Sequence, residues 1–248
     1  MKLCFWVAPL FLGMLAPRQA RAQYNDSVHY NLKFSSTGVL NRTDNSQSYL
    51  LTNALRFGVR IQEMDLNASA NYLYGQQDNS LKNNDFNSAL DFNIRSRFVP
   101  RMYYWGLGSY EKSYSLKVND RVQAGGGLAY SILDRGDSLF LNISDGILYE
   151  YSDLRLGDTA NVQSSIARNS ARLRMRYRWR QLLTFESTST LQNALNDGSD
   201  FIFRTNNSLS LKLYRWLSLT SALTYNKVSK TNKENLLITF GVTLEGWF

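Results

Sequence analysis

The chain has 248 residues and a formal net charge of +8 at pH 7, from 28 Lys and Arg, 20 Asp and Glu, and one uncharged His. Its mean hydropathy of −0.34 excludes a bundle of membrane helices, which would be far more apolar. A single cysteine, Cys4, excludes a disulfide framework and a cysteine metal site.

The first 22 residues have the pattern of a secretory signal peptide. Lys2 precedes an apolar run over residues 3–15, and Ala20-Arg21-Ala22 forms a small-residue cleavage motif. The apolar run is too short to span a membrane. We therefore expect a Sec signal peptide over residues 1–22 and one exported domain over residues 23–248.

The remaining chain alternates apolar and polar residues in about twelve segments, each about as long as a tilted membrane strand. In the second segment, for example, Leu55, Phe57 and Val59 share one face, whereas Arg56 and Arg60 share the other. The segments are 27–39, 48–61, 64–75, 85–98, 101–113, 120–133, 138–151, 166–179, 182–192, 201–213, 217–225 and 234–248. Because only alternate residues of such strands meet lipid, the pattern predicts an all-β fold, a transmembrane antiparallel up-and-down β-barrel.

The connections between these segments alternate in expected length. Those after even-numbered segments are tight, whereas those after odd-numbered segments, such as 76–84 and 152–165, are long and polar. Outer-membrane barrels have short periplasmic turns and longer outer loops, so we expect both chain ends on the periplasmic side. Trp105, Trp179, Trp216 and Trp247 all lie at the short-turn end, where an aromatic girdle is expected.

The last segment runs from Glu234 to Phe248 and separates an apolar face from a polar one with period two. An exported, alternating segment that ends on an aromatic residue resembles the terminal strand of a bacterial outer-membrane barrel. The resemblance implies that Phe248 is the signal read by the barrel-assembly machinery, and that outer-membrane lipid and lipopolysaccharide surround a monomer. The alternative is an edge strand of a soluble all-β protein.

Two further stretches resemble a particular family. Residues 103–112 read YYWGLGSYEK, and residues 124–130 read AGGGLAY. An aromatic strand that ends in Tyr-Glu-basic, followed by a glycine-rich strand that ends in tyrosine, resembles the YdiY-like salt-induced outer-membrane proteins, grouped as domain of unknown function 481. The resemblance implies an outer-membrane barrel of a Gram-negative bacterium and no particular activity.

The eighth segment contains a column of arginines at alternate positions: Arg172, Arg174, Arg176 and Arg178. A lipid-facing arginine near the membrane midplane would cost about 2–4 kcal/mol, so we expect the column to face the inside of the barrel, the lumen. By the same alternation Arg95 and Arg204 face the lumen, as do the acids Asp91, Glu150 and Glu186.

Two functions are compatible with this lumen. One is a small basic channel or a ligand-binding barrel, with a small anionic solute as its partner. The other is a structural or envelope-stress barrel, whose lumen is closed by arginine–carboxylate networks. Nucleic acid is not an expected partner, because the arginines are enclosed and the chain is exported.

A lipid-modifying enzyme is the least favoured function. The only histidine is His29, at the start of the first segment, and the chain has no Gly-x-Ser-x-Gly turn. The chain also lacks a second histidine for a metal site. We therefore expect no catalytic residue, no metal site and no cofactor.

Two local irregularities remain. Asp145 falls on the lipid-facing phase of its segment, and the adjacent Gly146 predicts a β-bulge that turns Asp145 away from lipid. Residues 125–127 are three consecutive glycines within a strand, which predict bending or close packing of the sheet.

Overall fold

The computed structural model describes residues 28–44, 46–61, 63–136, 138–156 and 160–247. The predicted signal peptide and Phe248 lie outside these residues. Within them every regular element is a strand, and no helix is long and apolar enough to cross a membrane. The strands are β1 (Val28–Arg42), β2 (Gln47–Ile61), β3 (Met64–Gln77), β4 (Ser80–Arg95), β5 (Met102–Ser113), β6 (Val118–Asp134), β7 (Leu139–Leu156), β8 (Ala160–Trp179), β9 (Leu183–Ala194), β10 (Phe201–Lys212), β11 (Leu217–Val228) and β12 (Lys233–Trp247).

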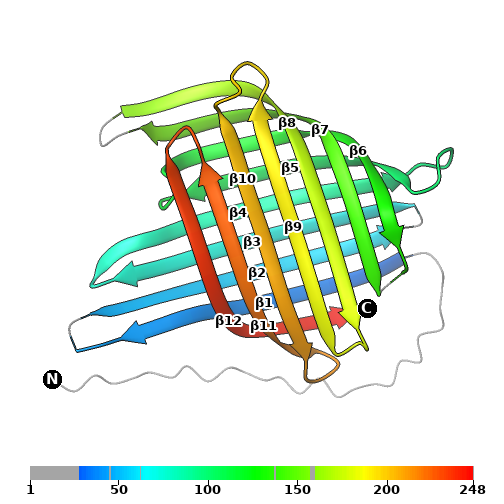
Figure 1. The fold of residues 1–248 in the computed structure, drawn as a ribbon, viewed down its shortest axis with the longest axis horizontal. Coiled ribbons are helices and arrows are strands. Elements are labelled where there is room, and N and C mark those ends of the chain that lie inside the picture. The colour runs from blue at the N-terminus through cyan, green and yellow to red at the C-terminus, as the bar shows by residue number, and fades with distance from the viewer. Residues whose placement is uncertain (1–27, 45, 62, 137, 157–159, 248) are drawn as a thin grey trace.

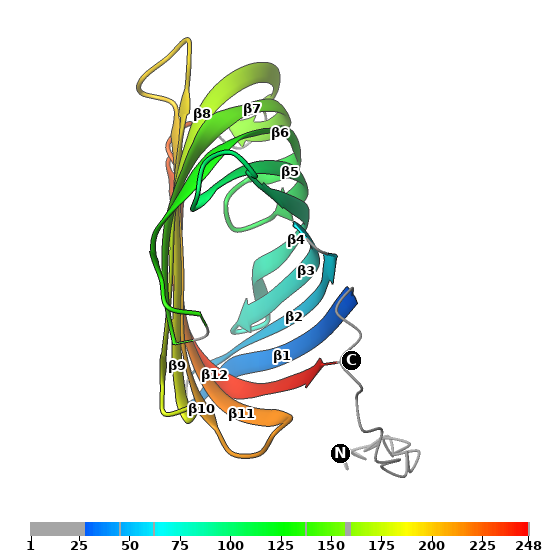
Figure 2. The same ribbon diagram turned by 90° about the vertical axis from the view of Figure 1, so that its right-hand side faces the viewer.

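The twelve strands form one closed antiparallel barrel. Each strand pairs with the next, and β1 pairs with β12 from Asn31 opposite Trp247 to Gly38 opposite Phe240. Figure 1 shows the wall of β8 to β12 crossing in front of the wall of β1 to β5, and Figure 2 shows β9 to β11 edge-on. The predicted up-and-down barrel of about twelve strands is confirmed. We call the end where β1 begins and β12 ends the terminal end, and the opposite end the distal end.

Large apolar side chains cover the outside of the barrel. In β12, for example, Leu236, Ile238 and Phe240 point outward and are 61%, 51% and 62% exposed. Similar residues lie on the outward phase of the other strands, and some stack across strands, as Tyr30 on β1 does with Phe57 on β2. A continuous apolar belt of this kind is a liability in water. Lipid is the surrounding that satisfies it.

Short hydroxyl side chains line the lumen where β11, β12 and β1 meet. The Thr239 hydroxyl donates to Thr37 at 3.0 Å, the Thr243 hydroxyl donates to Ser35 at 3.1 Å, and Thr220 lies 2.8 Å from Thr243. All four threonines are buried. Because these side chains are small, β1 and β11, which flank β12, also contact each other. The sheet therefore bends sharply at the strand that closes the barrel.

The predicted long polar loops are largely strand. Within the expected loop 76–84, β3 continues to Gln77 and β4 begins at Ser80. The connection is Asp78-Asn79, with φ angles of 48° and 61°, which suit the tight hairpin turn of right-twisted strands. The expected alternation of short and long connections is therefore wrong. A strand that extends beyond the lipid into water is polar on both faces, so its sequence resembles a loop.

The predicted bulge at Asp145 is also wrong. Asp145 pairs with Leu128 and Gly146 pairs with Gly127, with no register shift between β6 and β7 at that point. Asp145 stays exposed on the outer face and accepts a hydrogen bond from Asn169 at 2.9 Å. The glycine has a packing role instead, because a Cβ on Gly146 would lie 2.7 Å from the ring of Trp105 and 2.4 Å from the Gly126 oxygen. This confirms close packing around the three glycines of β6.

The aromatic girdle forms without Trp105. Trp179 and Trp216 are exposed at the terminal end, as predicted, and the side chain of Trp247 lies outside the described part of the chain. Trp105 is instead 4% exposed inside the barrel, where its Nε1 donates to the Leu128 oxygen at 3.1 Å. Trp105 occupies an odd-numbered position on β5, and the odd-numbered residues of this strand point into the barrel. The prediction considered only the height of Trp105 in the membrane and not this phase.

Candidate functional site

Charged side chains inside the barrel form two groups at different heights. One group lies in the distal half and is deeply buried. The other lies in the terminal half and is partly exposed to water. The arginines of β8 contribute to both groups, so this single strand connects them.

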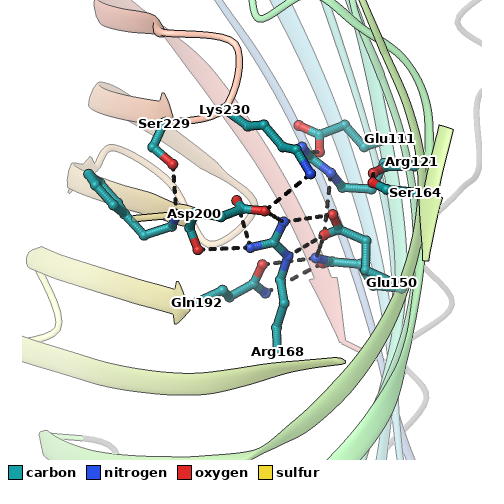
Figure 3. Close-up of polar contacts among 12 residues, drawn as sticks. Glu111, Arg121, Glu150, Ser164, Arg168, Gln192, Asp200, Ser229 and Lys230 are labelled. Carbon is teal, nitrogen blue, oxygen red and sulfur yellow. Dashed lines mark hydrogen bonds and ion pairs between the residues drawn. The ribbon is translucent and has the colours of Figure 1, made fainter. Parts of the chain in front are cut away.

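Seven residues in the distal half form a chain of alternating charge, which we call the charge chain. Its contacts are Arg204 Nη2 to Glu111 Oε2 at 2.5 Å, Glu111 Oε2 to Arg121 Nη1 at 2.8 Å, Arg121 Nε to Glu150 Oε2 at 3.4 Å, Glu150 Oε2 to Arg168 Nε at 2.9 Å, Arg168 Nη1 to Asp200 Oδ1 at 3.0 Å, and Asp200 Oδ2 to Lys230 Nζ at 3.7 Å. Most of these contacts are visible in Figure 3. The chain contains four cations and three carboxylates, so its charges are nearly balanced.

The charge chain crosses the lumen. Glu111 is on β5 and Arg204 is on β10, which are not neighbours in the sheet. A second bridge lies beside it, since Gln123 on β6 donates to Gln192 on β9 at 2.9 Å. Gln123 also donates to Glu150 at 2.6 Å, which ties the bridge to the charge chain. Opposite walls of the barrel are therefore held together in the distal half.

The central members of the charge chain have almost no contact with water. Arg121 and Arg168 have side chains that are 1% exposed, and that of Glu150 is fully buried. Arg168 is fully engaged, with two hydrogen bonds to Glu150 and three to Asp200. Arg121 is not, because its Nε contacts Glu150 without hydrogen-bond geometry and its Nη2 has no partner among the described residues. Buried charges of this kind are stable only when they are paired.

Apolar side chains close the lumen beyond the charge chain. We call this buried cluster the apolar cap, and its members are Leu116, Val118, Leu154, Ile202 and Val228. Leu116 lies in the β5–β6 connection, and the others come from β6, β7, β10 and β11. The cap thus joins the same two walls as the charge chain does. Its members are at most 3% exposed, so they have almost no contact with water.

The terminal half holds a second group, which we call the basic layer: Lys33, Arg56, Asp91, Arg172, Arg174, Arg176 and Glu186. Glu186 accepts from Lys33 at 3.2 Å and from Arg176 at 2.8 Å, while Arg172 contacts Asp91 at 3.1 Å. These pairs also cross the lumen, since Lys33 is on β1 and Glu186 on β9. The basic layer contains five cations and two carboxylates, so positive charge is in clear excess.

Two arginines of the basic layer have no carboxylate partner among the described residues. Arg174 lies within electrostatic reach of Arg172 and Arg56, which are both cations, and of Asp91, which is already paired with Arg172. Arg56 is exposed to the lumen and lies within electrostatic reach of Glu186, which is already paired with Lys33 and Arg176. Arg172 packs its guanidinium 5.1 Å from the ring centre of Trp105, and its Nη2 lacks a hydrogen-bond partner. Unused donors are therefore gathered around the middle of the lumen.

The predicted site residues are distributed unevenly over this arrangement. Arg172, Arg174 and Arg176 lie in the basic layer with Asp91 and Glu186, and Arg178 forms an interaction of its own further toward the terminal end. Arg204 and Glu150 lie in the charge chain. Arg95 is exposed at the terminal end and lines a hollow there.

Several members of the charge chain were not predicted from the sequence. Asp200 and Lys230 did not stand out in the sequence, because both lie in predicted loops. Glu111 belongs to the Tyr-Glu-basic motif of the family resemblance, but the motif implied no role for it in a site. The phase of Glu111 on β5 was the signal that places it in the lumen. Among the described residues no group of three or more His, Cys, Asp or Glu side chains could hold a metal ion.

Comparisons with known proteins identify the fold. The family described as "Protein of unknown function, DUF481" matches residues 22–245. No curated protein sequence matches the chain. The NanC porin is 12% identical, with a TM-score of 0.51 over 87% of this chain and 99% of the porin, and the translocator domain of the autotransporter NalP from Neisseria meningitidis is 11% identical, with a TM-score of 0.50 over 90% of each chain. These likenesses show the fold of a bacterial outer-membrane barrel and support a location in the outer membrane.

Proposed function

The chain belongs to the DUF481 family of proteins of unknown function, and from its lumen we propose that it is a channel for small anions, closed in this conformation by the charge chain. The observation that carries the proposal is the excess of cations in the basic layer. Arg56 and Arg174 have no carboxylate partner among the described residues, so they remain available for a solute. The proposal assigns no enzymatic activity to the barrel.

Electrostatics gives the direction of selectivity. A cleft lined by charge of one sign raises the local concentration of the opposite ion. In the basic layer Arg176 is 44% exposed and Arg56 is exposed, so water and ions reach these side chains. Guanidinium groups offer several donors in a fixed plane, which suits phosphate and carboxylate oxygens. Small oxyanions are therefore the preferred solutes.

The proposal orients the terminal end toward the periplasm, as in outer-membrane barrels that begin and end there. The basic layer is then reached from the periplasm, and the charge chain and the apolar cap separate it from the outside. Opening requires the walls of β5 to β7 and β9 to β11 to part. The charge chain sets the cost of that movement, because separating its members leaves charges buried without partners.

A structural barrel with a closed lumen is the second candidate. The specific observation in its favour is the burial of the charge chain, in which Arg121, Glu150 and Arg168 have almost no contact with water. Cross-lumen pairs would then serve only to brace the walls. This candidate predicts no conductance under any condition, which separates it from the first.

Conductance of single barrels in planar bilayers tests both candidates. The variant Arg204→Gln removes the contact between β5 and β10 and leaves Glu111 paired with Arg121. It also balances the charge chain at three cations and three carboxylates, so the barrel should still fold. We expect it to conduct more often than the wild type, with a reversal potential shifted toward the anion in a salt gradient.

The control is Arg155→Gln, since Arg155 lies on β7 at the distal end outside the charge chain, and among the described residues its guanidinium donates only to Asn119, at 3.4 Å. It should behave like the wild type. Arg174→Glu placed in the Arg204→Gln background should weaken or invert the anion preference. A folded Arg204→Gln barrel that never conducts would favour the structural candidate, and a cation-selective one would overturn the role of the basic layer.

A further inference from the structure

The outer surface of the barrel carries a second unusual feature, at the terminal end of β2 to β5. A hollow of about 460 Å³ opens there between the ends of the strands and the β4–β5 connection. This volume lies within the range of about 300–1,000 Å³ that is usual for small-molecule sites. The hollow faces the membrane, outside the lumen, so it is separate from the basic layer.

The wall of the hollow is a row of apolar side chains across four strands. Ile61 on β2 pairs with Met64 on β3, Met64 pairs with Ile94 on β4, and Ile94 pairs with Tyr104 on β5. All four point outward and are 37–50% exposed. Each is the last or nearly the last residue of its strand at the terminal end. The row therefore lies at the edge of the apolar belt, where hydrocarbon gives way to headgroups.

Three charged side chains border the same hollow. They are Glu63 in the β2–β3 turn, Arg95 at the end of β4, and Arg97 in the β4–β5 connection. All three are exposed, and none forms an ion pair or a side-chain hydrogen bond within the described residues. Arg95 lies opposite Tyr103, on the lumen phase of β4. Glu63 and Arg97 therefore provide one free acceptor group and one free donor group beside the apolar wall.

Backbone hydrogen bonds hold the segments that carry these charges. The backbone amide of Arg95 donates to the backbone carbonyl oxygen of Glu63 at 2.9 Å, which holds the β2–β3 turn beside the end of β4. The Ser96 hydroxyl accepts from the amides of Phe98 and Val99 at 3.3 and 3.2 Å, which shapes the β4–β5 connection. Phe98 is 93% exposed at the rim of the hollow, as expected of a side chain that inserts into lipid.

We propose that this hollow binds a glycerophospholipid whose headgroup joins a phosphate to a primary ammonium, as in phosphatidylethanolamine. Arg97 matches the phosphate, because charge-assisted hydrogen bonds from a guanidinium group to phosphate are strong and directional. The Glu63 carboxylate matches the ammonium. The acyl chains lie against the row of Ile61, Met64, Ile94 and Tyr104. The inference does not depend on conduction through the lumen.

The charge and the hydrogen-bond donors of the headgroup distinguish phosphatidylethanolamine from phosphatidylglycerol and phosphatidylcholine. Phosphatidylglycerol offers a phosphate, but its headgroup hydroxyls are neutral, so they donate weaker hydrogen bonds to Glu63 than an ammonium does. Phosphatidylcholine offers a positive charge, but its trimethylammonium group cannot donate a hydrogen bond. Only phosphatidylethanolamine offers both a phosphate for Arg97 and a charged hydrogen-bond donor for Glu63.

Native mass spectrometry of the detergent-purified barrel with each of the three lipids provides the test. We expect the wild type to retain phosphatidylethanolamine about tenfold more tightly than phosphatidylcholine, the effect of one charge-assisted hydrogen bond. Arg97→Gln should weaken the retention of all three lipids. Glu63→Gln should remove the advantage of phosphatidylethanolamine over phosphatidylcholine and leave their phosphate contact intact.

The control is Arg215→Gln, an exposed arginine in the β10–β11 connection away from the hollow, which should not change lipid retention. Because the substituted side chains are exposed and unpaired, the variants should fold, and the change in gel mobility on heating verifies this. Equal retention of the three lipids by the wild type, tightest retention of phosphatidylglycerol, or no effect of Arg97→Gln would overturn the proposal.

Discussion

Replacing Glu150 by glutamine tests whether the charge chain is a desolvated network. Glu150 is fully buried and accepts from Arg168 Nε at 2.9 Å, Arg168 Nη2 at 3.0 Å and Gln123 at 2.6 Å. Glutamine keeps the shape of the side chain and removes its charge, which leaves two buried arginines short of a partner. Removing one partner of a buried ion pair lowers the free energy of unfolding by about 3–5 kcal/mol. We expect a loss of this size in the free energy of unfolding.

The matched control is Glu186→Gln in the basic layer. Glu186 also contacts two cations, Lys33 at 3.2 Å and Arg176 at 2.8 Å, but its side chain is 24% exposed and that of Arg176 is 44% exposed. Water screens such pairs, and exposed ion pairs contribute about 0–1 kcal/mol. The same chemical change should therefore cost far less in the terminal half of the barrel than in the distal half.

Reversible folding into lipid vesicles in urea, followed by tryptophan fluorescence, measures both free energies. With a urea dependence of about 1–3 kcal/mol/M, the Glu150→Gln midpoint should fall by roughly 1 M or more. Adding Arg121→Gln to Glu150→Gln should restore part of the loss, because it removes the arginine with unpaired buried donors and leaves Glu111 paired with Arg204. A loss below about 1 kcal/mol, or one equal to that of Glu186→Gln, would refute the idea of a water-free network.

Three smaller changes test other parts of the fold. Gly146→Ala should cost about 1–3 kcal/mol of stability in the same urea assay, because its Cβ would meet the Trp105 ring, whereas Gly108→Ala has open space and should be neutral. At the positive φ of Asn79, Asn79→Val should destabilise the β3–β4 hairpin by about 1–2 kcal/mol, and Asn79→Gly should not. His29→Ala should leave the lipid composition of cells that carry the protein unchanged; a lipid modification lost in this variant would restore the case for an enzyme.

Period-two alternation was sufficient to predict the barrel. The terminal strand shows why, since the predicted range 234–248 and the observed β12 (Lys233–Trp247) agree within one residue. The inward phase of the arginine column followed from the cost of placing charge in lipid, which is a local argument. Alternation did not predict the strand ends on either side of the Asp78-Asn79 turn, because strands that extend beyond the lipid into water carry no apolar face.

The choice of partners could not be predicted in the same way. Glu150 pairs with Arg168 and Arg121, and the partner of Arg172 is Asp91, four strands away around the barrel. Which walls meet depends on how the sheet bends, and the bend depends on small residues at β12 and on glycines around Trp105. Such contacts are long-range in sequence, and no local pattern encodes them.

The charge chain has a consequence for the lifetime of the folded barrel. Its members come from β5, β6, β7, β8 and β10 and from two distal connections, so no single hairpin contains it. The contact between Glu111 and Arg204 forms only after the sheet has curled enough to bring β5 to β10. Interactions that form after the transition state slow unfolding without accelerating folding. The charge chain should therefore act mainly on the rate of unfolding, so that a barrel without it would assemble at the usual speed and persist for a shorter time.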